Sequence, residues 1–176
     1  KNWNFCPFYH KLTYIDKLKG FQGNEYTAFG TAMHTICENK LLKKSKDAYE
    51  EFKFEFIEEI AKLPENLELN EKLIVDMGSQ AEKVIPGIIP ALDDYFKEGY
   101  GVIATEEALM VQIEDTEYNF KGYIDAVVKT PDGKIHIIDW KTCSWGWDLR
   151  RRSDPMVTYQ LTLYKIFYAQ KHNIKL

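Results

Sequence analysis

Residues 122–142 read GYIDAVVKTPDGKIHIIDWKT and contain the features that decide the fold. Two runs of apolar and β-branched residues flank Thr130-Pro131-Asp132-Gly133, a combination typical of a turn between two strands. The pattern predicts one strand from Tyr118 to Lys129 and the next from Lys134 to Thr142. A preceding strand over Val102–Ile113, joined by a short polar turn, would complete an antiparallel meander.

Asp125, Asp139 and Lys141 lie within or beside the most apolar parts of these strands. Asp139 and Lys141 are two residues apart and should point to the same side, while Asp125 lies on the neighbouring strand. Buried carboxylates are costly unless they are paired or bound to a metal ion, and oxygen ligands of this kind suit Mg²⁺ or Mn²⁺. Such an ion polarises a phosphodiester, and Lys141 could orient the attacking water or neutralise developing charge. These residue types predict phosphodiester hydrolysis.

An isolated Asp-x-Lys is nevertheless a loose pattern. Asp139 and Lys141 could equally form a solvated ion pair on an edge strand, with Asp125 close to a turn. The interpretation as an active site therefore depends on other parts of the chain.

The first hundred residues have helical rather than strand periodicity. Apolar side chains recur every three or four residues, Thr27 is a candidate N-cap, and Pro86 and Pro90 should break or kink the last helix of this half. We expect helices over about 4–18, 27–44, 47–64 and 70–97, and another over 155–172. The order predicts a mixed α/β fold in a single domain, residues 1–176, with a helical region over about 1–100 and a catalytic sheet and helix over about 101–176.

Composition narrows the class of protein only a little. The net charge of −4 does not exclude a nucleic-acid partner, because screening limits the reach of each charge to about 8–10 Å. No apolar run approaches the ~20 residues that span a bilayer, so we expect no membrane partner and a cytoplasmic location. The three cysteines show no CxxC spacing, which indicates reduced thiols rather than a disulfide framework.

Four motifs follow one another along the chain. They are AFGTAMH (residues 28–34), GYID (122–125), IIDWKT (137–142) and YQLTLY (159–164). Together they resemble the RecB-like branch of the PD-(D/E)xK nuclease superfamily, which includes phage and bacterial recombination exonucleases and CRISPR-associated adaptation nucleases. In that family a helix carries a histidine, a strand ends in G-x-x-D, the next strand reads I-I-D-x-K-T, and a later helix carries Q-x-x-x-Y. The resemblance implies a restriction-endonuclease-like mixed β-sheet flanked by helices.

The resemblance also implies roles at the metal. His34, Asp125 and Asp139 are similar to the family's metal ligands, and the backbone carbonyl of Trp140 would complete the site. Lys141 resembles the catalytic lysine. On its own, His34 on an apolar helix would be interpreted as a hydrogen-bonded core residue.

Other positions would support the site or hold DNA. Gln160 and Tyr164, one helical turn apart, resemble the pair that supports the active site and contacts DNA. Glu106 and Glu107 both match a glutamate that contributes in this family, but strand alternation allows only one to face the site, and either could be a solvated charge. The run Arg150-Arg151-Arg152 could hold DNA phosphates, with a merely solvated loop as the alternative.

Many relatives bind an iron–sulfur cluster through one cysteine near the N-terminus and three after the Q-x-x-x-Y helix. Cys6 matches the first position, but no cysteine follows Tyr164. Four thiolates are the usual requirement, so a cluster would need a longer full-length chain. The start at Lys1 and the end near a further predicted strand lead us to expect a domain truncated at one or both ends, or else a member without the cluster.

These observations predict a Mg²⁺- or Mn²⁺-dependent deoxyribonuclease. We expect an exonuclease or end-processing enzyme of recombination, repair or phage DNA metabolism, in the cytoplasm of a bacterial cell or phage-infected host. Its partners would be single-stranded DNA or duplex ends and a recombination or replication protein. The alternative is a catalytically silent nuclease-like module that binds DNA or a protein; another hydrolase class lacks support, because G-x-S-x-G, P-loop and HExxH motifs are absent.

Overall fold

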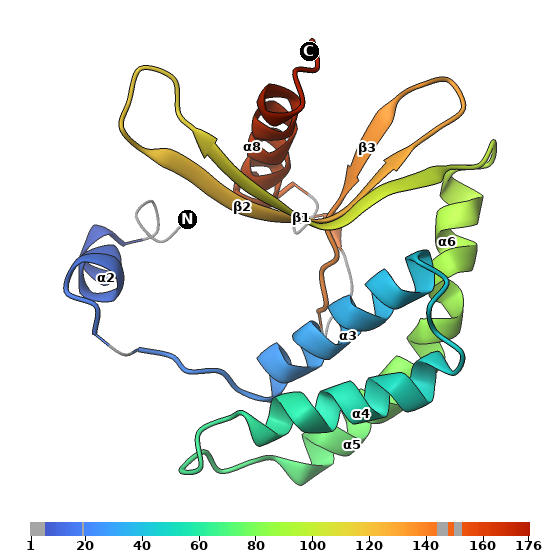
Figure 1. Ribbon diagram of the computed structural model, residues 1–176. Helices are drawn as coiled ribbons and strands as arrows, with labels where there is room; N and C mark the ends of the chain where they lie inside the picture. Colours follow the sequence, from blue (N-terminus) through green and yellow to red (C-terminus); the bar gives the residue numbers. More distant parts are fainter. Residues whose placement is uncertain (1–5, 19, 144–147, 150–152) are drawn as a thin grey trace.

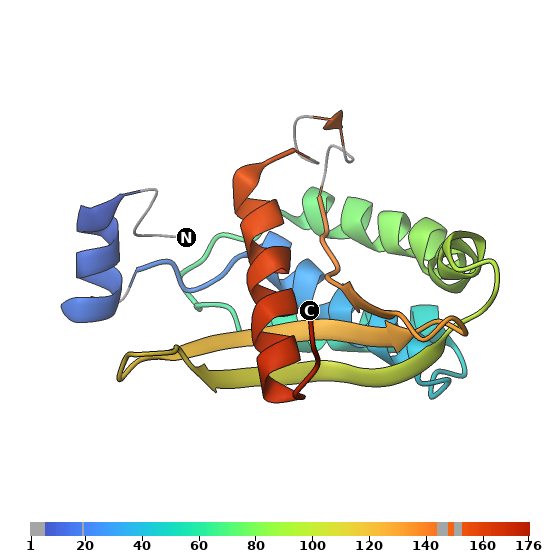
Figure 2. The same cartoon turned by 90° about the horizontal axis from the view of Figure 1, so that it is seen from above.

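The computed structural model describes residues 6–18, 20–143, 148–149 and 153–176. Within them, three antiparallel strands form a sheet in the order β1 (Gly101–Gln112), β2 (Asn119–Lys129) and β3 (Ile135–Ile138), which confirms the predicted meander. Helix α8 (Pro155–Lys171) covers one face of this sheet, and Figure 2 shows it running across β1 and β2. The other long helices lie on the opposite face (Figure 1). The mixed α/β class is confirmed.

A layer of helices supports the second face of the sheet. It contains α3 (Glu25–Leu41), α4 (Ala48–Ala61), α5 (Glu71–Val84) and α6 (Ile88–Tyr95). The apolar faces of these helices meet in one buried cluster that includes Phe29, Met33, Ile36, Phe52, Phe56, Met77 and Ile88. This packing fixes α3 between α4 and the sheet. Among the described residues, no helix has the combination of length and apolar character needed to cross a membrane.

Helix α3 begins two residues earlier than its predicted cap. The side chain of Asn24 accepts a hydrogen bond from the backbone N–H of Thr27 at 3.2 Å, and the hydroxyl of Thr27 accepts one from the N–H of Asn24 at 2.9 Å. This reciprocal pair is a capping box, so the prediction of Thr27 as N-cap was wrong and Thr27 occupies the third helical position. The helix ends at Leu41 rather than near residue 44, because Lys43 has a left-handed φ of 54°.

The predicted helix over 70–97 is divided. Helix α5 ends at Val84, residues Ile85–Gly87 form a 3₁₀ turn, and α6 follows. Pro86 lies in this break, as predicted, because its ring cannot continue an α-helix. Pro90 causes no break, since it lies in the first turn of α6, where a backbone N–H has no helical partner.

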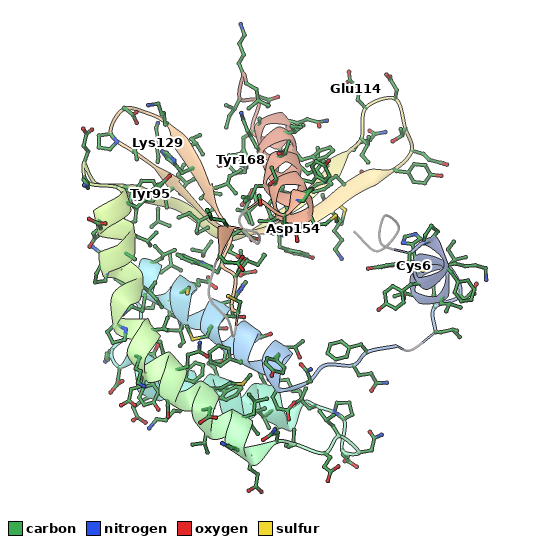
Figure 3. The ribbon with its side chains drawn as sticks, turned by 180° about the vertical axis from the view of Figure 1, so that it is seen from behind. Cys6, Tyr95, Glu114, Lys129, Asp154 and Tyr168 are labelled. Carbon is green, nitrogen blue, oxygen red and sulfur yellow. The ribbon has the colours of Figure 1, made fainter. Side chains whose placement is uncertain are left out.

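The N-terminal segment is less regular than predicted. In place of one helix over residues 4–18, a short α2 (Pro7–His10) leads into a single π-helical turn, η1 (Lys11–Ile15). The Sγ atom of Cys6 accepts the N–H of Tyr9 at 3.4 Å and so caps α2. Figures 1 and 3 show this segment to one side of the helical layer, connected to α3 by an extended stretch.

The alternation of side chains between the two faces of the sheet is interrupted in strand β1 at Thr105 and Glu106. The hydroxyl of Thr105 donates to Glu38 of α3 at 2.8 Å, and Glu106 faces the same helix. Ala104, on one side of this pair, packs toward α8, and Glu107, on the other, forms an ion pair with Lys171 of α8 at 2.7 Å. Two consecutive residues therefore point to the helical layer, and Glu106 adopts an unusual positive φ of 47° at this irregularity.

The alternation of side chains is interrupted in strand β2 as well, opposite Thr105 and Glu106. Ile124 and Val127 pack in the cluster beneath α8, whereas Asp125 and Ala126 between them face α3 and α6. Because Thr105 pairs with Ala126 and Glu107 pairs with Ile124, Glu106 lies opposite Asp125. Together the two strands turn two carboxylates toward His34 of α3.

Candidate metal centre and active site

Three potential metal ligands converge between α3 and the sheet. His34 comes from the middle of α3, Glu106 from β1 and Asp125 from β2, and one ligand atom of each lies within 4.8 Å of the others. The Nδ1 atom of His34 is 3.4 Å from Oδ1 of Asp125. Asp125 is buried, while the His34 side chain keeps 30% of its surface exposed. The cluster therefore has a buried centre and an accessible side.

The chain after β3 folds across this cluster. The backbone N–H of Trp140 donates to Oδ2 of Asp125, so it is not available for a strand ladder. For this reason β3 ends at Ile138, and the prediction of a strand continuing to Thr142 was wrong. Asp139 and Lys141 are consequently carried by an irregular segment that Asp125 holds in place.

Asp139 belongs to a second, adjoining network. One of its oxygens contacts the ammonium of Lys141, and the other accepts a hydrogen bond from Nε2 of Gln160 at 3.1 Å. The same Nε2 also donates to the hydroxyl of Tyr164 at 3.0 Å. The Asp139 side chain is only 6% exposed, whereas that of Lys141 is 34% exposed. Asp139, Lys141, Gln160 and Tyr164 are thus brought together, with the lysine reaching solvent.

The structure separates the two glutamates that the sequence left open. Glu106 joins His34 and Asp125, but Glu107 points to the opposite face and binds Lys171 at 2.7 Å and His172 at 2.9 Å. Those two partners lower the pKa of Glu107 and hold its carboxylate against α8 and the residue that follows it. Glu106 is therefore the glutamate available to the cluster.

Hydrogen bonding, burial and neighbouring charges alter the pKa values of His34 and Glu106. The hydrogen bond to Asp125 raises the pKa of His34 above 6.5, although partial burial opposes this rise. Partial desolvation, followed by the charges of Asp125 and Glu38, raises the pKa of Glu106. Both groups must release a proton to bind a cation, so cation and proton compete, and the binding of a cation should strengthen as pH rises through these raised values.

The pKa of Asp139 is raised for a different reason. Burial of the carboxyl is the largest cause, and the ammonium of Lys141 acts in the opposite direction. The lysine therefore favours the ionised form of this carboxyl, whereas its burial favours the protonated form.

The donor set fits a divalent cation. An imidazole nitrogen and two carboxylates converge in the cluster. After desolvation, the charge of Asp125 contributes to the raised pKa of Glu106, so the two carboxylates repel each other. A divalent ion would relieve that repulsion, and carboxylate oxygens are ligands that Mg²⁺ and Mn²⁺ accept. The imidazole favours Mn²⁺ over Mg²⁺, because Mg²⁺ prefers oxygen.

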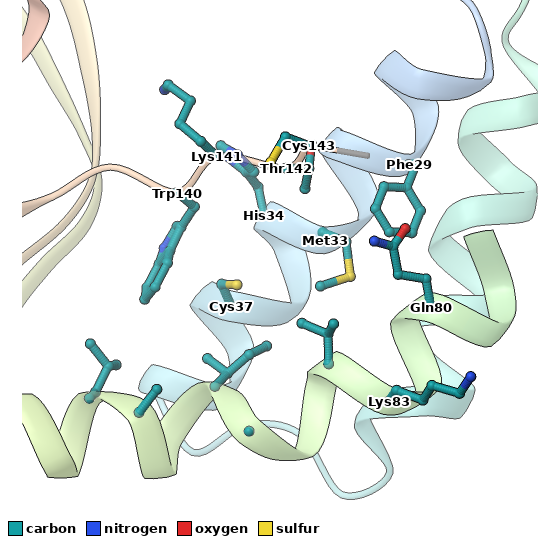
Figure 4. Close-up of a pocket in the computed structure, with 15 residues that line it drawn as sticks. Phe29, Met33, His34, Cys37, Gln80, Lys83, Trp140, Lys141, Thr142 and Cys143 are labelled. Carbon is teal, nitrogen blue, oxygen red and sulfur yellow. The ribbon is translucent and has the colours of Figure 1, made fainter. Parts of the chain in front are cut away.

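Two cavities flank the cluster, and His34 lines both. One of about 570 Å³ has polar residues in its lining, among them Thr31, Thr35, Glu38 and Glu106. The other, of about 590 Å³, lies beneath residues 140–143 and is largely apolar (Figure 4). A substrate could therefore approach from either side of the histidine.

Some residues that the sequence predicted for the site are not part of the metal centre as the structure describes it. Cys6 lies on the separate N-terminal segment (Figure 3), and the candidate metal-ligand group among the described residues contains no cysteine. The run Arg150–Arg152 lies outside the residues that the structure describes. Glu38, by contrast, was missed. It lies one helical turn after His34, on the same face, which is a spacing that could have identified it.

Gly122 controls the position of Tyr164. A Cβ atom added at Gly122 would lie 2.7 Å from Cε1 of Tyr164 and 3.0 Å from Cε1 of Phe120. Tyr164 is buried, and its hydroxyl is tied through Gln160 to Asp139. The absence of a side chain at residue 122 thus allows the tyrosine ring to lie against β2 and support the Asp139 network.

We expect Gly122→Ala to lower the free energy of unfolding by about 1–3 kcal/mol, because it overpacks a buried contact. Urea unfolding measures this effect. Gly101→Ala is the matched control in the same sheet, since its added Cβ would be 4.0 Å from the nearest atom. Combining Gly122→Ala with Tyr164→Leu should remove most of the additional loss; equal losses with and without the tyrosine ring would contradict the steric explanation.

Comparison with protein-family models gives one finding for the whole chain. Residues 1–175 match the PD-(D/E)XK nuclease superfamily. Searches of curated proteins and of solved structures gave no match. The three-stranded antiparallel sheet between α8 and the helical layer is consistent with the restriction-endonuclease-like fold of that superfamily.

Proposed function

The chain belongs to the PD-(D/E)XK nuclease superfamily, and on this premise we propose that it hydrolyses DNA phosphodiester bonds with a divalent metal ion held by His34, Glu106 and Asp125. The observation that carries this proposal is the convergence of these three side chains, from three different elements, within 4.8 Å. They lie beside Lys141, the cationic side chain of the Asp139 network.

The metal ion, when bound, would polarise the phosphodiester and lower the pKa of a coordinated water. His34, Glu106 and Asp125 would hold it, and Trp140 fixes Asp125 through its backbone N–H. The mixed nitrogen and oxygen donors lead us to expect greater activity with Mn²⁺ than with Mg²⁺. The Trp140 carbonyl remains our candidate for a further ligand.

Lys141 supplies the positive charge that faces the substrate. Its exposed ammonium can orient the attacking water or neutralise charge that develops on the phosphate. Asp139 positions this lysine, and Gln160 in turn holds Asp139. Because both oxygens of Asp139 are engaged, we assign it first to positioning Lys141; it would serve as a metal ligand only through an oxygen that Lys141 or Gln160 releases.

The order of the four motifs supports a finer proposal. We propose that the protein belongs to the RecB-like branch and acts as an exonuclease or end-processing nuclease of recombination, repair or phage DNA metabolism. Single-stranded DNA or duplex ends would be the substrate, and a recombination or replication protein a further partner. Gln160 and Tyr164, and the run Arg150–Arg152, are our candidates for DNA contacts.

Adjacent glutamates provide the test of this function. Glu106→Gln should reduce Mn²⁺-dependent cleavage of labelled DNA about 100-fold, because it removes a charged ligand. Glu107→Gln is the control, since Glu107 binds Lys171 and His172 on the other face and its loss should alter cleavage less than about twofold. Cleavage that persists in EDTA, or equal losses in the two variants, would overturn the proposal.

A further inference from the structure

The apolar cavity beside the candidate metal centre has no part in the proposed hydrolysis. It has a volume of about 590 Å³ and is enclosed by α3, by the region from α5 to α6, and by residues 140–143 (Figure 4). His34 and Lys141 form part of its lining, so the cavity and the proposed site of hydrolysis share a boundary. A group bound in it would therefore lie beside His34 and Lys141.

The walls of this cavity suit an uncharged aromatic ring. Phe29, Met33, Leu92 and Trp140 contribute aromatic and aliphatic surface. In Figure 4 the side chains of Met33, Cys37 and Trp140 surround the same space. Cys37 adds no charge, because burial raises the pKa of its thiol to about 12. A phosphate or carboxylate would lose its hydration here without a fixed partner, whereas a flat heterocycle would gain apolar contact.

Charged groups occur at the margins instead. Lys141 lies on the side of the metal centre, and Lys83 and Gln80 come from α5 on the far side (Figure 4). Both lysines are exposed. A neutral interior with an ammonium on two sides matches the chemistry of a nucleotide, whose base is uncharged and whose flanking phosphates are anionic.

We propose that this cavity binds the base of an unpaired nucleotide next to the phosphate that is hydrolysed. The inference rests on the proposed nuclease function and deepens it, because it specifies the substrate. A paired base can enter the cavity only after it leaves the stack, so single-stranded DNA and unpaired ends are favoured over intact duplex. Contact with a ring face is tolerant of sequence, so all four bases should be accepted.

The binding step is tested in EDTA, where no hydrolysis takes place. The probe is a single-stranded oligonucleotide that contains the fluorescent base 2-aminopurine. Its fluorescence should change on binding to the wild-type protein. Ala91→Phe should weaken that binding about tenfold, because Ala91 lines the cavity from α6 and is exposed, so an added ring can fill the space without disturbing the core. Ala61→Phe adds the same ring to an exposed position on α4 outside the cavity and should have no effect.

A cleavage assay with Mn²⁺ completes the test. An oligonucleotide that lacks the base beside the cleaved phosphate should be cut about tenfold more slowly than the intact one by the wild-type protein. Ala91→Phe should cut both at the same slow rate. If Ala91→Phe changes neither binding nor cleavage, or if duplex and single strands are cut equally well, the base pocket is refuted while nuclease function stands. If no cleavage occurs but the fluorescence change and its loss in Ala91→Phe remain, the pocket stands and the nuclease proposal fails.

Discussion

Asp125→Asn is expected to abolish Mn²⁺-dependent DNA cleavage and to weaken Mn²⁺ binding by at least about 100-fold. Asp125 is the centre of the candidate site, since it contacts His34 and accepts the N–H of Trp140. Asparagine keeps the size of the side chain and an oxygen that can accept from Trp140, but it loses the charge that a cation requires. Calorimetric titration with Mn²⁺ measures the affinity, and cleavage of labelled DNA measures the activity.

The control for this substitution is Asp94→Asn, which removes the same charge from an exposed position on α6. It should leave affinity and activity unchanged. The thermal unfolding of Asp125→Asn should still be cooperative, because the shape of the buried group is retained. Full Mn²⁺ affinity in Asp125→Asn would contradict its assignment as a ligand.

Lys141→Ala is expected to lower kcat about 10²–10³-fold while Mn²⁺ binding changes little. The ammonium of Lys141 contacts Asp139 and lies outside the cluster of His34, Glu106 and Asp125, so its loss removes charge stabilisation rather than a ligand. Steady-state kinetics on single-stranded DNA and calorimetry with Mn²⁺ separate these two effects.

Lys129→Ala serves as the control, because it removes an exposed lysine at the end of β2. It should leave kcat unchanged. A parallel loss of kcat and Mn²⁺ affinity in Lys141→Ala would show that the lysine acts by maintaining the metal site. Unchanged kcat would exclude it from catalysis.

Local sequence patterns predicted much of the fold. The turn at Thr130–Gly133 and the alternation around it were sufficient for the β2–β3 hairpin, because hairpins are specified by neighbouring residues. The end of β3 was not predictable in this way. Residues 139–142 continue the predicted alternation of side chains, but the N–H of Trp140 binds a side chain on β2, fifteen positions earlier in the chain. A long-range contact therefore ended the strand.

In the candidate site, too, some features follow from local sequence patterns and others do not. The helical spacing of Gln160 and Tyr164 and the proximity of Asp139 to Lys141 follow from local geometry, and the structure brings all four together. The choice between Glu106 and Glu107 does not follow from it. That choice depends on the interrupted alternation in β1 and on the positive φ of Glu106. Neither can be predicted from the regular alternation of side chains along a strand.

The central claim is that His34, Glu106 and Asp125 bind the divalent ion. Crystals of the protein grown with Mn²⁺ and measured for anomalous scattering test it most directly. The claim predicts an anomalous peak within coordination distance of His34, Glu106 and Asp125. A Mn²⁺ ion held elsewhere, or a peak that excludes Glu106 and His34, would contradict it.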